Sequence, residues 1–114
     1  MTREEFNRVV AEALDSLPEA FRSRIENVAI LVEDVPAGQA PHPKQVLLGV
    51  FHGVPMTKRS VFDLPTGPSH IVLYQKNIEA VCANEEEVRK QITLTVIHEL
   101  GHYFGMSEEQ LRGV

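Results

Sequence analysis

The chain has 114 residues, of which 43% are hydrophobic and 24% are charged, a composition typical of a globular domain. Its net charge of −5 does not favour binding to nucleic acid or to an anionic membrane. No apolar run approaches the roughly 20 residues that span a bilayer, and the polar start lacks a signal peptide's apolar core. The one cysteine, Cys82, cannot form an intrachain disulfide. We therefore expect one cytoplasmic domain over residues 1–114.

The first third of the chain predicts two helices. Thr2 and Glu5 have the spacing of a capping box at the start of a helix over residues 2–16. Pro18 ends this helix and suits the first turn of a short second helix that reaches Arg24. The first helix presents one apolar stripe, formed by Phe6, Val9, Val10, Ala13, Leu14 and Leu17.

Three short apolar segments, at residues 27–35, 46–51 and 70–75, predict strands. Residues 34–44 and 52–69 are rich in proline and glycine and predict loops. The second of these loops is unusually long for a compact domain, which often indicates a functional segment. A short helix is expected at residues 77–83.

The last predicted helix covers residues 84–104. Asn84 is a good N-cap with Glu87 three residues later, and Gly105 suits the position after the helix, where φ is positive. Apolar residues point in nearly every direction around the second half of this helix: Ile92, Leu94, Val96, Ile97, Leu100, Tyr103 and Phe104. A helix that is apolar on all sides is normally buried, so we expect it at the centre of the domain.

Within this helix stands the sequence HELGH, residues 98–102. His98 and His102 lie four residues apart, on one helical face, where two imidazoles can bind one metal ion. Glu99 is rotated by about 100° from His98, so it suits a general base better than a ligand. Zinc in such a site lowers the pKa of bound water to about 7. The alternative is a buried network of polar side chains, which would have to satisfy three polar groups without a metal.

A zinc hydrolase site needs a third protein ligand. Gly105 allows the chain to reverse after the helix, and Glu108 follows three residues later. Glu108 is therefore a candidate ligand, with a solvated position on a helix surface as its alternative. The loop histidines His42, His52 and His70 are further candidates, although a loop histidine is more often solvated or hydrogen-bonded.

The pattern His98-Glu99-x-x-His102-x-x-Gly105-x-x-Glu108 resembles the extended motif of metzincin peptidases. Residues 48–55 (LGVFHGVP) and 95–107 (TVIHELGHYFGMS) resemble a family of short bacterial proteins, the minimal zincins or zincin-like metallopeptidases. This resemblance implies an α+β fold with a small mixed sheet and a buried helix that carries the HExxH motif. It also implies Zn²⁺ bound by His98 and His102, and Glu99 as the general base.

The predicted activity is zinc-dependent hydrolysis of a peptide or protein substrate. An edge strand beside the helix could bind extended peptide, and residues 70–75 are our candidate for this strand. Tyr74 and Tyr103 could donate to a tetrahedral intermediate or pack at the edge of the core. Two alternatives remain: a zinc-binding interaction module with little or no turnover, and a zinc hydrolase that acts on a substrate such as RNA.

Overall fold

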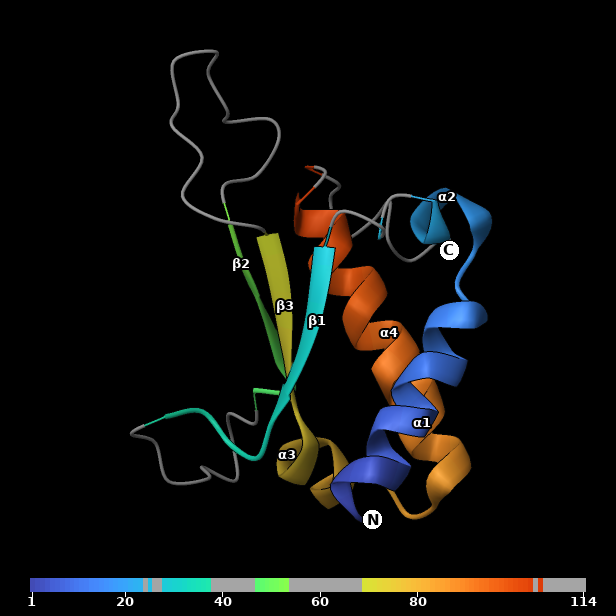
Figure 1. The fold of residues 1–114 in the computed structure, drawn as a ribbon, viewed down its shortest axis with the longest axis vertical. Helices are drawn as coiled ribbons and strands as arrows, with labels where there is room; N and C mark the ends of the chain where they lie inside the picture. Colours follow the sequence, from blue (N-terminus) through green and yellow to red (C-terminus); the bar gives the residue numbers. More distant parts are fainter. Residues whose placement is uncertain (24, 26–27, 38–46, 54–68, 104, 106–114) are drawn as a thin grey trace.

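The computed structural model describes residues 1–23, 25, 28–37, 47–53, 69–103 and 105. In these residues it contains helices and a small mixed sheet, so the α+β prediction is confirmed (Figure 1). The predicted helices and strands all occur, with ends shifted by at most a few residues. In chain order they are α1 (Arg3–Asp15), α2 (Glu19–Arg22), β1 (Val28–Glu33), β2 (Gly49–His52), β3 (Ser69–Tyr74), α3 (Gln75–Ala80) and α4 (Glu85–Tyr103).

The described strands form one sheet in the order β1-β3-β2. β3 pairs with β1 in parallel and with β2 in antiparallel orientation. The prediction that residues 70–75 form an edge strand is therefore wrong, because β3 is the central strand. Five of the six residues of β3 are buried, which is the pattern of a strand covered on both faces. Among the described strands, the edges are β1 and β2.

The helices α1 and α4 lie over one face of the sheet (Figure 1). Alternate strand residues point toward these helices, as the period of two in a strand requires. Ile71 and Leu73 of β3 are fully buried in this layer, and Phe51 of β2 packs against it. On the opposite face, Val72 and Tyr74 of β3 are also buried, whereas Leu31 of β1 is 46% exposed.

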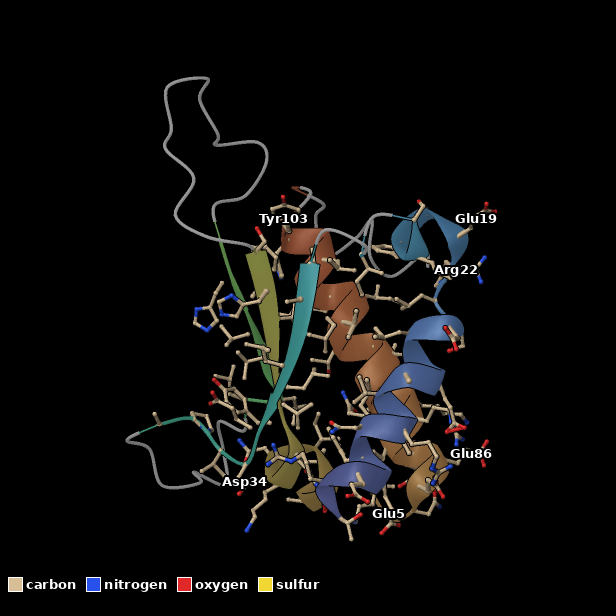
Figure 2. The ribbon with its side chains drawn as sticks, in the orientation of Figure 1. Glu5, Glu19, Arg22, Asp34, Glu86 and Tyr103 are labelled. Atoms are coloured by element: carbon tan, nitrogen blue, oxygen red, sulfur yellow. The ribbon has the colours of Figure 1, made fainter. Side chains whose placement is uncertain are left out.

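The start of α1 is fixed by the predicted capping box. The Thr2 hydroxyl accepts a hydrogen bond from the Glu5 backbone, and the Glu5 carboxylate accepts one from the Thr2 backbone. Arg3 then joins α1 to the sheet, donating to the Val32 carbonyl at 2.7 Å and to Asp34 at 2.5 Å. Asp34 follows β1, near the N-terminal end of α1 (Figure 2).

The helix α4 includes residues 98–102, but it is not buried on all sides as the sequence predicts, since eight of its 19 residues are buried and Leu94 is 58% exposed. At its start, the Asn84 side chain accepts a hydrogen bond of 2.9 Å from the backbone N–H of Glu87, as predicted. The Glu87 carboxylate accepts a hydrogen bond from the backbone N–H of Ala83. α4 packs against α1, α3, β2 and β3. Its buried residues are Val88, Ile92, Thr95, Val96, Ile97, Leu100, Gly101 and Tyr103. In the described part of the chain, no helix combines the length and apolarity needed to cross a membrane.

Candidate metal centre

The two histidines of the motif lie side by side on the last turns of α4. The Nε2 atoms of His98 and His102 are 3.0 Å apart, and their rings meet at 75°. Two nitrogens that each lie about 2.0–2.1 Å from a tetrahedral zinc ion are roughly 3.3 Å apart. His102 is exposed and His98 is half-buried. The pair therefore presents two nitrogen donors, at nearly the separation a zinc ion requires, on an accessible part of the helix.

Glu99 is half-buried on the side of α4 that faces β2. Its Oε2 accepts a hydrogen bond of 3.2 Å from the backbone N–H of Phe51. The carbonyl of Leu48, the residue before β2, accepts a hydrogen bond from the Tyr74 N–H of β3. Because this pairing alternates along an antiparallel strand, Val50 and His52 also direct their backbone groups toward β3. The backbone groups of Phe51 therefore point away from β3. Glu99 thus reaches the edge of β2 that no described strand covers.

A glycine allows α4 to approach this edge closely. A Cβ atom on Gly49 would lie 2.8 Å from Cγ2 of Thr95 and 3.1 Å from the carbonyl oxygen of Val72. Because real Cβ atoms essentially never approach another atom as closely as 2.8 Å, a larger residue at position 49 would force Thr95 or the nearby backbone to shift. The close approach keeps Glu99 within reach of Phe51.

A groove of about 280 Å³ runs between the start of β2 and α4. Residues 47–49 form one wall, and α4 supplies Gln91, Leu94, Thr95, His98 and Glu99. The groove therefore includes one candidate ligand and the candidate base. His98 and Glu99 are predicted from the sequence, but the apolar part of this groove is not, because Leu94 has the spacing of the buried residues of the helix.

The structure does not place the other described candidate ligands, His52 and His70, beside His98 and His102. His52 and His70 are paired across β2 and β3, with rings stacked at 4.8 Å. Their neighbours Phe51 and Ile71 face the helices, so strand alternation places the two histidines on the opposite face of the sheet. Glu108 and His42 lie outside the described residues. Within the described ranges, no group of three or more histidine, cysteine or acidic side chains is assembled.

The turn after α4 has the predicted backbone geometry. Gly105 has a φ of 73°, and its N–H donates to the His102 carbonyl. This left-handed conformation favours glycine, because a Cβ atom would clash with the backbone. Gly105, three residues after the second histidine, therefore has the backbone conformation that suits the position after a helix.

The two tyrosines are core-edge residues. Tyr103, at the end of α4, is 9% exposed, and its ring lies 4.6 Å from that of Phe51 (Figure 2). Burial, with a smaller effect from Glu33, raises the pKa of Tyr74. Cys82 is half-buried against the core, and burial raises the pKa of its thiol.

Comparison with known proteins identifies relatives of this domain. The model of the zincin-like metallopeptidase family matches residues 25–114. The chain is also similar to the solved structure of a conserved hypothetical protein from Thermus thermophilus, with 25% identity and a TM-score of 0.57. That similarity covers 98% of each chain. No curated protein matches the sequence.

Proposed function

The chain belongs to the zincin-like metallopeptidase family, and on this basis we propose that it hydrolyses peptide bonds with a zinc ion. The observation that carries the proposal is the juxtaposition on α4. Two histidine nitrogens 3.0 Å apart lie next to a glutamate that reaches the edge of a strand. His98 and His102 are the proposed ligands, and Glu99 is the proposed general base.

Each residue has a distinct role in this mechanism. His98 and His102 would hold the zinc ion, which when bound would lower the pKa of a water molecule and polarise a carbonyl group. Glu99 accepts the proton of the attacking water and passes it to the leaving amine. Glu108 is the proposed third protein ligand, since it follows Gly105 at the spacing of the extended motif.

The edge of β2 is the proposed binding place for the substrate backbone. Gly49 and the carbonyl of Phe51 direct backbone groups away from β3, where an extended peptide can pair with them by strand addition, while the Phe51 N–H stays bonded to Glu99. This edge lies beside Glu99, whereas the β3 strand that the sequence favoured is paired on both sides. A peptide paired with β2 would place a backbone carbonyl beside the proposed zinc ligands.

The proposal is tested with the purified full chain. Zinc stoichiometry is measured first, and cleavage of a diverse peptide library is then followed by mass spectrometry. We expect metal-dependent products from the wild type and none from Glu99→Ala, with zinc retained by both. If both proteins hold zinc and give the same products, the peptidase proposal is wrong, and a zinc-binding interaction module becomes the better explanation.

The RNA alternative is tested in the same preparation. Net charge of −5 works against binding of a polyanion, so we expect no salt-dependent binding of a labelled single-stranded RNA. RNA cleavage that is lost in Glu99→Ala would favour that alternative over the peptidase.

A further inference from the structure

A second pair of histidines lies on the face of the sheet opposite α1 and α4. His52 is the last residue of β2 and His70 is the second residue of β3, and the antiparallel register places them directly opposite each other. Their ring centres are 4.8 Å apart. The corresponding distance for His98 and His102 is 4.6 Å. The sheet thus holds two imidazoles almost as close together as the pair in the candidate metal centre.

The separation of the two rings suits a shared metal ion. An ion about 2.0–2.1 Å from one nitrogen of each ring lies about 3.2 Å from each ring centre, which puts the centres about 4.5–5.2 Å apart for N–metal–N angles of about 90–109°. The observed distance of 4.8 Å falls within this range. The rings meet at 25°, so they must turn about their Cβ–Cγ bonds before both planes contain the ion. That rotation has a broad low-energy range in histidine.

The strand ends that carry the pair are held closely together. Gly53, which follows His52, has a φ of 151°, and a Cβ atom there would lie 2.8 Å from Oγ of Ser69 and 2.9 Å from Cε1 of Phe51. Glycine permits both this conformation and this close contact between the end of β2 and the start of β3. Because the backbone sets the distance between His52 and His70, binding of an ion requires little further ordering of the chain.

The surroundings of the pair are compatible with a cation. His52 is exposed and His70 is half-buried, so the pair is accessible from solvent. The residue beside His70 on β1 is Ala29, whose methyl side chain is too short to cover the rings. The three described strands contain no lysine or arginine that would repel a positive ion. Accessible paired imidazoles of this kind suit Zn²⁺, Ni²⁺ and Cu²⁺.

We propose that His52 and His70 bind a late transition-metal divalent ion, with water completing its coordination, at a site separate from the candidate metal centre. The bound ion bridges β2 and β3. By the Irving–Williams order, Cu²⁺ binds such a pair more tightly than Zn²⁺ does. A pair that supplies two protein ligands binds zinc more weakly than a centre that supplies three, so a first equivalent of zinc is expected on α4. This inference does not depend on peptide hydrolysis.

The experiment uses the full chain with His98→Ala and His102→Ala, which removes the pair on α4. Cu²⁺ is titrated by calorimetry, and electron paramagnetic resonance counts the imidazole nitrogens around the ion. We expect one Cu²⁺ per chain, bound by two imidazoles. Adding His52→Phe should weaken binding at least about tenfold, because the new ring can stack on His70 but supplies no nitrogen. In the wild-type background, the same substitution should lower the number of bound Cu²⁺ ions by one.

The control is His42→Ala in the same double variant, which removes a histidine that does not belong to the pair. It should leave the affinity and the two-imidazole signal unchanged. Unchanged Cu²⁺ binding in His52→Phe would overturn the proposal and leave the pair a packing contact of the sheet. An equal loss in His42→Ala and His52→Phe would also overturn it, because the binding would then be a general property of the histidines.

Discussion

The backbone N–H of Phe51 donates to the carboxylate of Glu99 at 3.2 Å and thereby joins an edge strand to the motif helix. The ring of the same phenylalanine packs on Tyr103 at the end of that helix. Phe51 thus orients the proposed general base with its backbone and the C-terminal end of α4 with its side chain. These two contacts connect β2 to the helix that carries the candidate metal ligands.

Replacement of this backbone donor should lower catalysis. Phe51→Pro lacks the N–H, and proline is tolerated on an edge strand where that group points away from the sheet. Phe51→Ala is the matched control, since it removes the same ring and keeps the N–H. We expect kcat/KM of the proline variant to be about tenfold below that of the alanine variant, because a hydrogen bond to a charged group is lost. Equal values in two folded, zinc-loaded variants would contradict this role.

Zinc binding should depend on the two motif histidines. His98→Ala and His102→Ala each remove one nitrogen donor of the pair, and we expect each to lose stoichiometric zinc in equilibrium dialysis. His52→Ala is the control, because this exposed histidine lies on the other face of the sheet and should leave zinc content unchanged. Glu108→Ala examines the third ligand, with weaker zinc binding expected. Full retention of zinc in that variant would remove Glu108 from the site.

The close approach of β2 and α4 predicts a steric effect at Gly49. In Gly49→Ala, the new Cβ atom would meet Cγ2 of Thr95 at 2.8 Å. We expect the free energy of unfolding, measured by urea denaturation, to fall by about 1–3 kcal/mol. Adding Thr95→Ser should restore part of this loss, because serine lacks the clashing methyl group and keeps the hydroxyl. A double variant as unstable as the single one would assign the effect to Val72 and the sheet instead.

Cys82 should react slowly with alkylating reagents near neutral pH. Burial, followed by the negative charge of Glu87, raises the pKa of its thiol. The folded state therefore retains this proton to higher pH than the unfolded state, so thiol ionisation opposes folding as pH rises above about 8.5. Iodoacetamide rates measured against pH should rise later for the native protein than in urea. Glu87→Gln should bring the native profile closer to the unfolded one, and coincident native and unfolded profiles would contradict the assignment.

The sequence predicts the helices and strands well, because their signals are local. The capping pairs Thr2–Glu5 and Asn84–Glu87 and the positive φ at Gly105 depend on neighbouring residues only. The spacing of His98 and His102 is equally local, since any helix brings residues four apart to one face. These features follow from the amino-acid order without knowledge of the fold.

The order of the strands does not follow from local signals. The sequence favours residues 70–75 as an edge strand, whereas among the described strands β3 is central and β2 lies at the edge, beside α4. Strand order depends on which long-range pairings bury the most apolar surface, and the continuous apolar run of β3 is the one sign of its central place. The exposure of Leu94 could not be predicted for a similar reason, because helical periodicity does not distinguish a core position from the wall of a groove.

The sequence by itself determined the chemistry available to this protein: two histidines and a glutamate at the spacing of a zinc site, on a helix followed by a glycine turn. Only the tertiary structure determines which strand edge and which apolar side chains lie beside these residues. Packing of α4 against Gly49 places the edge of β2 and the Phe51 N–H beside Glu99, and it leaves Leu47 and Leu94 exposed in one groove. The physical reason is that these contacts join residues more than 40 positions apart, and only the burial of the whole core selects them.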